Sequence, residues 1–206
     1  MEDSMRKRQL RIAPGQSIPV PLDLNLLDSK ASSAVIRISY WAEGETESKK
    51  DESIDFTVSF RHSPLYAAHK VTHPHPSGII SYSILRPPSK NATCSLGVTN
   101  APVALLLHGA GVEADSDIVK KAFDPVPDLC AWVLLPSGVT TWSSDDWHTW
   151  GFLDVIDAVY YIQIWLQNHS WKGVGVDISK LLVIGHSNGG KFLHSSLGLK
   201  RILTDM

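Results

Sequence analysis

Hydrophobic and polar residues alternate along the first part of the chain. Between residues 53 and 60 every second side chain is hydrophobic, and residues 36–40 repeat the pattern. Residues 18–24 also alternate, but Pro19 and Pro21 lack amide donors and place that segment at a sheet edge. The charged run at 42–52 is expected to form an exposed loop. Strands with one solvated face explain the alternation, so the pattern predicts a β-rich N-terminal module over residues 1–77.

After Ser77 the pattern changes to short, almost wholly hydrophobic runs separated by helix-like stretches. The runs cover residues 103–107, 131–135 and 181–184. Runs of this kind suit strands that are buried on both faces of a sheet. Hydrophobic residues from 152 to 166 recur at helical spacing, with Asp154 and Asp157 near the start, where the helix dipole favours negative charge. We therefore predict an α/β domain, a mostly parallel sheet with flanking helices, over residues 78–206.

The composition excludes several classes of partner. Hydrophobic residues make up 43% of the 206 residues and charged residues 19%, as in globular proteins. Nineteen basic and twenty-one acidic side chains give a net charge of −2, so we expect no nucleic-acid partner. The longest hydrophobic runs are too short to cross a bilayer, so we expect no membrane insertion. Residues 1–10 lack the hydrophobic core of a signal peptide, which leaves an intracellular protein or a secreted parent whose N-terminus is missing.

Cysteine and histidine residues give little sign of a metal site. Cys94 and Cys130 allow at most one disulfide and no cysteine-only zinc site. His69, His73 and His75 stand beside prolines that indicate an extended linker, and no carboxylate or cysteine completes a set of ligands. We therefore expect no metal. The chain also contains two acceptor triplets for N-glycosylation, Asn91-Ala92-Thr93 and Asn168-His169-Ser170, which matter only if it enters the secretory pathway.

The strongest chemical motif is Gly185-His186-Ser187-Asn188-Gly189-Gly190, which directly follows a predicted strand. A nucleophile elbow needs a tight turn from strand to helix, and glycines beside the serine remove Cβ atoms that would clash there. The turn exposes the Ser187 hydroxyl, and the following helix directs N–H groups at the reacting centre. We predict Ser187 as the nucleophile; a plain turn of small residues is the alternative.

A second loop, His108-Gly109-Ala110-Gly111, follows the predicted strand at 103–107. In acyl transfer a carbonyl oxygen becomes negatively charged, and backbone N–H groups stabilise it by factors of about 10²–10³ each. We predict Asn188 as one oxyanion donor and Gly109 or Ala110 as the other. His108 is assigned no part in proton transfer.

These two motifs resemble those of α/β-hydrolases. The segment Asp145-Asp146-Trp147-His148-Thr149-Trp150-Gly151 is similar, more specifically, to prolyl oligopeptidase-type peptidases that carry a β-rich N-terminal region. The resemblance extends from about Ile79 to Gly190 and implies an acyl-enzyme mechanism without a cofactor. It implies that three tryptophans line the substrate pocket, namely Trp142, Trp147 and Trp150.

The chain departs from this family after the elbow. The family's triad runs in the order Ser, Asp or Glu, then His, but only His194 and Asp205 follow Ser187, and neither is placed to complete it. We therefore expect an incomplete α/β-hydrolase domain that is inactive and poorly soluble by itself, its acid and base lying beyond residue 206. The alternative is a substitute acid and base among Asp145, Asp146 and His148. A pocket-shaping role for the loop that contains them is favoured over it.

The sequence thus predicts a serine hydrolase of the prolyl oligopeptidase type that cleaves peptide or ester bonds. A carboxylesterase is the alternative within the enzymes, because the elbow and the oxyanion loop are common to both. A non-catalytic remnant that acts in binding is the alternative outside them. No metal or other cofactor is implied, and the specific substrate and the oligomeric state stay open.

Overall fold

The computed structural model describes residues 11–17, 30–41, 52–60, 62–92, 94, 99–142 and 146–195. By their contacts these residues divide into a smaller unit within Leu22–Leu65 and a larger unit that contains Tyr66 onwards. The strand predicted at 18–24 lies outside the described residues, as do residues 42–51 of the loop predicted at 42–52, whose last residue begins β2.

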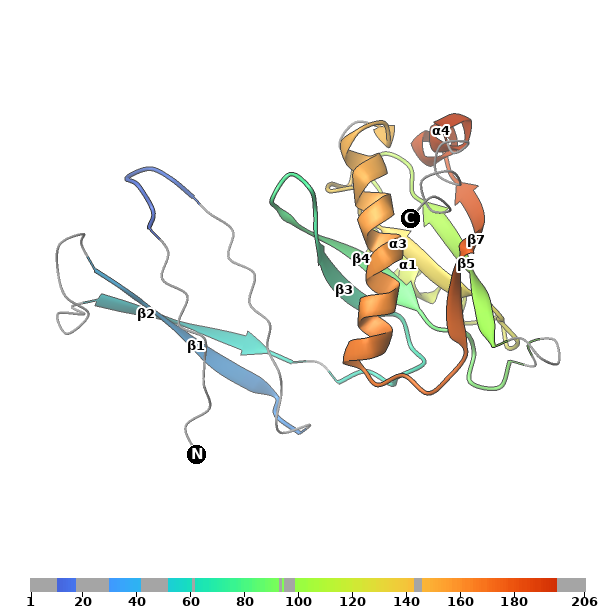
Figure 1. Ribbon diagram of the computed structural model, residues 1–206, viewed down its shortest axis with the longest axis horizontal. Coiled ribbons are helices and arrows are strands. Elements are labelled where there is room, and N and C mark those ends of the chain that lie inside the picture. Colours follow the sequence, from blue (N-terminus) through green and yellow to red (C-terminus); the bar gives the residue numbers. More distant parts are fainter. Residues whose placement is uncertain are drawn as a thin grey trace. The chain divides into compact units, whose positions relative to one another are not determined.

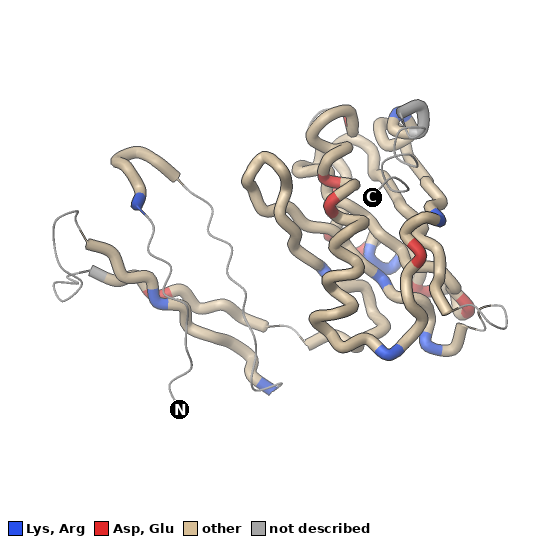
Figure 2. The backbone as a smooth tube through the Cα atoms, viewed as in Figure 1, with Lys and Arg blue, Asp and Glu red and all other residues tan. Residues whose placement is uncertain are grey.

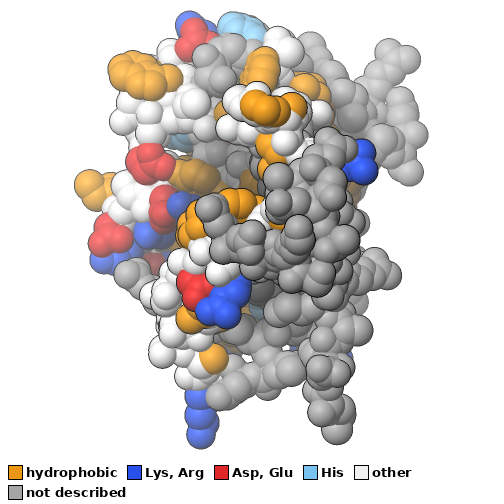
Figure 3. Space-filling view, turned by 90° about the vertical axis from the view of Figure 1, so that its left-hand side faces the viewer, with side chains coloured by type: hydrophobic (Ala, Val, Ile, Leu, Met, Phe, Trp, Pro, Cys, Tyr) orange, Lys and Arg blue, Asp and Glu red, His pale blue; other side chains and the backbone are white. Residues whose placement is uncertain are grey.

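The smaller unit is an antiparallel pair of strands, β1 (Ser33–Tyr40) and β2 (Glu52–Ser59), as the alternation predicts. Arg37 and Asp55 face each other across the pair and form a two-pronged ion pair with distances of 2.7 and 2.8 Å. The large hydrophobic side chains exposed on these two strands are Val35, Ile38, Tyr40, Ile54 and Phe56. Hydrophobic groups accordingly reach the surface beside charged ones (Figure 3). A two-stranded sheet by itself is only marginally stable in water.

The larger unit is built on a five-stranded sheet with the order β3-β4-β6-β5-β7. Its strands are β3 (His69–Pro74), β4 (Ile80–Arg86), β5 (Asn100–Leu107), β6 (Trp132–Pro136) and β7 (Gly175–Gly185). β5, β6 and β7 are parallel, whereas β3 and β4 form an antiparallel hairpin attached to β6. Helix α3 (Trp150–Asn168) lies along one face of the sheet, and α4 (Asn188–Ser195) stands at the end of β7 (Figure 1). The predicted mixture of a partly parallel sheet and helices is therefore present.

Hydrophobic side chains pack on both faces of β5 and β6. Leu105 and Leu134 are completely buried and pack with residues of α3 on one face. Val133 and Ala104 pack on the other face near α1 (Asp117–Lys121). Burying each large side chain contributes about 1.5–3 kcal/mol. Burial on both faces explains the uninterrupted hydrophobic runs, as predicted for 103–107 and 131–135. The same prediction for 181–184 is wrong, because β7 is an edge strand and its Leu182 and Ile184 are 61% and 45% exposed.

The interpretation of the histidine-rich segment as a linker is wrong. His69–Pro74 is strand β3, which pairs with β4, so this sheet begins before residue 77. Val71, His73 and His75 alternate inward with exposures of 7%, 1% and 3%. The strand pattern is present in the sequence but is carried by histidines at inward positions. Pro74 is tolerated because β3 is an edge strand, where a missing amide donor costs no ladder hydrogen bond.

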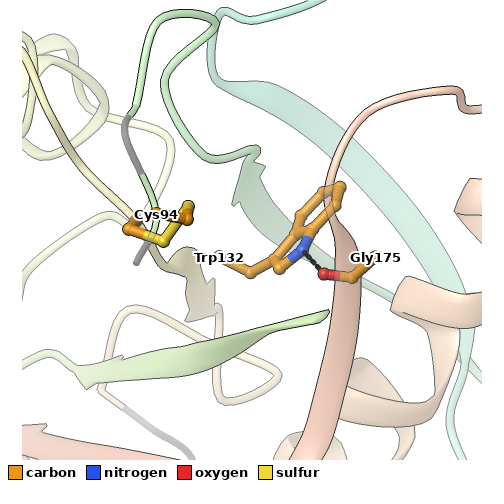
Figure 4. The surroundings of a disulfide bond; sticks show 4 residues. Cys94, Trp132 and Gly175 are labelled. Carbon is orange, nitrogen blue, oxygen red and sulfur yellow. Dashed lines mark hydrogen bonds between the residues drawn. A yellow bond between two sulfur atoms is a disulfide. The ribbon is translucent and has the colours of Figure 1, made fainter. Parts of the chain in front are cut away.

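A disulfide joins Cys94 to Cys130 just before β6, with a Cα–Cα distance of 5.4 Å. Beside it, the Trp132 indole N–H donates to the Gly175 carbonyl at 3.0 Å and links the starts of β6 and β7 (Figure 4). The pair closes a loop of 36 residues that contains β5. The bridge therefore stabilises the amino-terminal edge of the parallel strands.

Acidic and basic residues are interspersed along the larger unit (Figure 2). Within the described residues, no helix has the length and hydrophobicity needed to span a membrane.

Candidate active site

The turn at the end of β7 holds Ser187 in a strained, exposed position. β7 ends at Gly185 and α4 begins at Asn188, so two residues make the whole reversal. Ser187 has φ of 54°, in the left-handed region that costs a non-glycine residue about 1–3 kcal/mol. Two helical bonds fix the turn, because the Gly189 and Gly190 N–H groups donate to the His186 and Ser187 carbonyls at 3.0 and 2.9 Å. This is the geometry that a nucleophile elbow requires.

Glycines permit this turn, as the sequence predicts. A Cβ on Gly185 would overlap the backbone of Gly189 and Gly190, and a Cβ on Gly189 would overlap the Leu107 carbonyl. Neither neighbour is the flexible end of a side chain, so the backbone itself would have to move. The elbow therefore packs directly against the end of β5, the strand that leads into the 108–111 loop.

That loop lies against the elbow. A Cβ on Gly109 would stand 3.0 Å from Ser187 Cβ and 3.0 Å from His186 Nδ1, so only glycine fits without displacement. The Gly111 N–H already donates to the Thr141 carbonyl at 2.9 Å. The Gly111 N–H is therefore engaged elsewhere. The oxyanion prediction rests on the N–H groups of the other two small residues of the loop, Gly109 and Ala110. Asn188 lies in the first turn of α4, where N–H groups have no intrahelical acceptor.

His108 anchors the base of the loop. Its Nε2–H donates to the Ser137 carbonyl at 2.9 Å, and its own carbonyl accepts from the Trp147 indole N–H at 3.1 Å. The two rings meet edge to face, with centroids 5.0 Å apart. These contacts attach the loop after β5 to the loop after β6 and account for His108 without any part in proton transfer.

Backbone strain is concentrated at this edge of the sheet. Five non-glycine residues have positive φ in the described residues, and four of them lie in the loops after β6 and β7: Val139, Asp146, Trp147 and Ser187. Loops that follow parallel strands share the carboxyl-terminal edge, where α/β proteins place their ligands. Strained backbone persists only where its surroundings hold it, and it gathers at functional sites. The strain therefore marks the edge that carries Ser187.

Asp146 links the loop after β6 to the elbow. Its Oδ1 accepts from the Asn188 side-chain amide at 2.5 Å, and its Oδ2 lies 2.8 Å from Lys191 Nζ. Both carboxylate oxygens are therefore engaged in holding α4. This favours an anchoring role over that of a substitute acid. His148 is exposed, and Asp145 lies outside the described residues.

The three predicted pocket tryptophans have different surroundings. Trp142 is 65% exposed and Trp150 is 45% exposed, so both present surface to a ligand. Trp150 also stacks on His75 with an interplanar angle of 16°. Trp147 is fully buried behind the 108–111 loop, where it supports that loop and has no exposed surface of its own. The pocket-lining role stays a prediction.

No acid–base pair for Ser187 is found among the described residues. The Ser187 hydroxyl makes none of the hydrogen bonds found there, and the histidine nearest in sequence, His186, is part of the turn itself. His194 belongs to α4, but its side chain is not described, and Asp205 lies outside the described residues. The described residues thus hold the tight turn at Ser187 and the 108–111 loop in contact, without a general base beside the serine.

A buried polar pair behind the site was missed by the sequence analysis. His73 of β3 and Asp154 of α3 are 1% and 0% exposed, with His73 Nε2 3.8 Å from Asp154 Oδ1. His73 Nε2 also hydrogen-bonds Ser83 Oγ at 3.0 Å. Burial lowers the pKa of His73 below its ordinary value of 6.5, although the Asp154 charge acts in the opposite direction.

The interpretation of Asp154 as a charge near the positive end of a helix dipole is wrong. The first turn of α3 carries no acidic residue. Asp154 faces the interior instead, and its Oδ2 accepts the Gly138 N–H at 2.8 Å. An aspartate at a position that helical spacing assigns to a buried face was the available signal, because carboxylates are almost never fully buried without a partner.

One curated relative matches nearly the whole chain. It is described as "Uncharacterized secreted protein" from Arthroderma benhamiae and is 33% identical over 189 residues, which are 91% of this chain. The chain spans 20% of that relative's length. No protein-family model matches the chain.

Several solved structures are similar to part of this chain. A puromycin-hydrolyzing peptidase of Mycobacterium tuberculosis covers 67% of this chain and 23% of its own, with 18% identity and a TM-score of 0.44. Brefeldin A esterase, a bacterial homologue of human hormone sensitive lipase, covers 70% and 39%, with 18% identity and a TM-score of 0.44. A prolyl endopeptidase covers 70% and 21%, with 17% identity and a TM-score of 0.43.

Proposed function

We propose that this chain carries the nucleophile and the oxyanion hole of a serine hydrolase. Ser187 attacks a peptide or ester carbonyl and forms an acyl-enzyme, which water then cleaves. The observation that supports this most strongly is the position of Ser187, strained at φ 54° between Gly185 and the first turn of α4. A turn with no function has no need of that strain.

The contact between two loops supports the same conclusion. Gly109 approaches Ser187 so closely that a methyl group would not fit between them. A carbonyl carbon bonded to Ser187 Oγ would therefore place its oxygen beside the N–H groups of Asn188 and the Gly109–Ala110 segment. Donors held in advance at the point where charge develops contribute about 10²–10³ in rate each.

Ser187 needs a general base, because a serine hydroxyl at its ordinary pKa is a weak nucleophile. We propose that a histidine and an acid from outside the described residues supply it, in the order that elbow-type hydrolases use. Without them, turnover falls by a factor of about 10⁶. We therefore expect the 206-residue chain alone to be inactive.

The proposed reaction is that of a prolyl oligopeptidase-type peptidase, on the strength of the sequence motif at Asp145–Gly151 and the exposed Trp142 and Trp150. A carboxylesterase is the second candidate, because the same elbow and loop serve ester substrates. We propose a secreted parent protein, which the Cys94–Cys130 disulfide favours, since such bonds persist in oxidising compartments.

Pre-steady-state kinetics test the proposal. The protein is purified from the cells that produce it and mixed with a p-nitrophenyl ester or a peptide p-nitroanilide. An acyl-enzyme releases one equivalent of nitrophenol or nitroaniline in a burst before the slower steady state. Ser187→Ala is expected to abolish the burst, whereas Ser179→Ala, which changes an exposed serine near the start of the same strand, is expected to keep it.

The outcomes separate the candidates. Turnover of both substrates supports a peptidase, and turnover of the ester alone supports a carboxylesterase. A burst that survives Ser187→Ala contradicts the proposed nucleophile, and no turnover of either substrate favours a non-catalytic protein. A burst from the 206-residue chain alone would show that a base within these residues activates Ser187, with Asp145, Asp146 and His148 as the candidates.

A further inference from the structure

The end of α3 presents an exposed asparagine at the sheet edge opposite to Ser187. The helix ends at Asn168, and β7 begins only seven residues later at Gly175, so Asn168 lies at the amino-terminal edge of the parallel strands. Ser187 lies at the carboxyl-terminal end of the same β7 strand. Asn168, His169 and Ser170 are all exposed.

The local contacts leave this asparagine available. The His169 N–H and Nδ1–H both donate to the Trp165 carbonyl, at 3.0 and 2.9 Å, and the Ser170 N–H donates to the Gln167 carbonyl at 3.1 Å. These bonds close the last turn of the helix through the backbone and the His169 ring. The amide of Asn168 takes no part in them and points from a fixed helix end towards solvent.

We propose that Asn168 carries an N-linked oligosaccharide. Asn168-His169-Ser170 has the acceptor pattern, and the Cys94–Cys130 disulfide at the same sheet edge fits folding in an oxidising lumen. In the transfer, Asn168 Nδ2 bonds to C1 of a sugar on a lipid diphosphate. The C1–O bond to the diphosphate breaks, and the amide loses one proton. The finished glycan projects away from the edge that carries Ser187.

Peptide mass spectrometry tests this modification independently of any catalytic activity. The protein is isolated from its producing cells and treated with peptide N-glycosidase in heavy-oxygen water, which converts a glycosylated asparagine into labelled aspartate. We expect label at Asn168 and its loss in the Ser170→Ala variant, which keeps the asparagine but removes the acceptor hydroxyl. Ser170→Thr is expected to retain it. An unlabelled Asn168 in the secreted protein would overturn the proposal, as would label that persists in Ser170→Ala.

A second inference concerns the strained turn after β6. Gly138 and Val139 are both left-handed, with φ of 64° and 72°. This region is a genuine outlier for a β-branched residue such as Val139. Two side chains hold the turn, because Asp154 Oδ2 accepts the Gly138 N–H at 2.8 Å and Ser137 Oγ accepts the Val139 N–H at 3.2 Å.

The held turn bears on the oxyanion loop at two points. The Ser137 carbonyl accepts from His108 Nε2–H at 2.9 Å, and the Thr141 carbonyl accepts the Gly111 N–H at 2.9 Å. The two bonds flank Gly109 and Ala110. Asp154 is thus connected to the predicted oxyanion donors through the turn and its hydrogen bonds to the 108–111 loop. It contacts neither donor itself.

We infer that Asp154 is a positioning residue for the oxyanion hole, an inference that rests on the proposed function. A carboxylate with no exposed surface is costly to bury, and its Oδ1 has no hydrogen-bond partner among the described residues. Replacing a buried ion pair with well-packed hydrophobic residues is often neutral or stabilising, so burial of Asp154 beside His73 is weak evidence for a purely structural role. Its fixed bond to the Gly138 N–H gives it a specific task, which is to hold a turn that the backbone alone does not favour.

Labelling kinetics with a fluorophosphonate separate positioning from folding. Asp154→Ala, Asp154→Asn and Asp157→Asn are introduced into the gene in the producing cells. Asp157 lies on the same helix and has no bond to the turn, so its variant is a control for loss of charge. The labelling rate constant is expressed per reactive active site. Unfolded protein therefore does not lower the value.

We expect Asp154→Ala to lower this rate constant about tenfold or more, with partial rescue by Asn, which keeps an acceptor oxygen for the Gly138 N–H. Asp157→Asn is expected to react as the parent does. Parental rate constants in both Asp154 variants, with only the yield of folded protein reduced, would overturn the positioning role. A parent protein that does not react at all would instead contradict the proposed function.

Discussion

Replacing Gly109 with alanine tests whether the 108–111 loop works with Ser187. The added Cβ would lie 3.0 Å from Ser187 Cβ, whereas unstrained carbon atoms pack at about 3.5–4.0 Å. The loop must therefore retreat by a few tenths of an ångström, because the elbow is fixed by Gly185 and Gly189. The His186 ring is exposed and can turn aside, but Ser187 Cβ cannot.

The expected loss follows from that displacement. A misplacement of about 1 Å costs up to about 10²-fold in rate, and a single oxyanion donor is worth about 10²–10³. We therefore expect Gly109→Ala to slow labelling by a fluorophosphonate about 10- to 100-fold, equivalent to about 1.4–2.7 kcal/mol in the barrier. The Tm should change by less than about 4 °C, because strain is partly offset by the lower entropy of the unfolded chain.

Gly190→Ala is the matched control. A Cβ there meets only the Gly185 carbonyl oxygen, at an ordinary 3.9 Å, and alanine favours the helix that contains it. The two variants differ from the parent by the same methyl group, so labelling rates and melting curves are compared directly on protein from the producing cells. Labelling of Gly109→Ala at the parental rate would refute the role of the loop.

Three further outcomes follow from the structure. Gly189→Ala forces a Cβ into the Leu107 carbonyl and should destabilise the fold by about 1–3 kcal/mol, seen as a lower Tm; an unchanged Tm would contradict this packing. Replacing Cys94 and Cys130 by alanine opens a 36-residue loop and should cost about 2–4 kcal/mol in denaturant unfolding; an unchanged midpoint would argue against the bridge. Burial lowers the pKa of His73, so the free energy of unfolding should fall as the pH drops below 6.5. The fall should be smaller in the His73→Gln variant. An equal pH dependence in parent and variant would show that His73 is not the source of the effect.

The sign of the pH effect follows from proton binding. The unfolded chain protonates this histidine near pH 6.5, whereas the folded protein resists protonation to a lower pH. Between those values the unfolded state binds more protons, so stability is lost as the pH falls.

Periodicity predicted the strands and the helix whose inward positions are hydrophobic. β5 and β6 are buried on both faces, and their hydrophobic runs appear at the expected positions. α3 extends the predicted helical pattern from Trp150 to Asn168. β3 was missed because one of its inward side chains is His73. Histidine is a polar residue, but this one is buried and hydrogen-bonds Ser83.

The site was predictable to the extent that its chemistry is local. The elbow glycines have a steric role that spacing alone indicates, and the structure confirms that a Cβ has no room at Gly185 or Gly189. The task of Asp154 was not predictable, because its partner Gly138 lies in a loop whose path depends on the whole sheet. Likewise, only the fold shows that Trp147 supports the 108–111 loop from behind.

The most direct test of the central claim is to locate a covalent fluorophosphonate adduct by tandem mass spectrometry. The protein is labelled in extracts of its producing cells, digested and sequenced at the modified residue. We predict a single adduct on Ser187 and none in the Ser187→Ala variant. An adduct on another serine, or equal labelling of the variant, would show that the strained turn after β7 is not the catalytic centre.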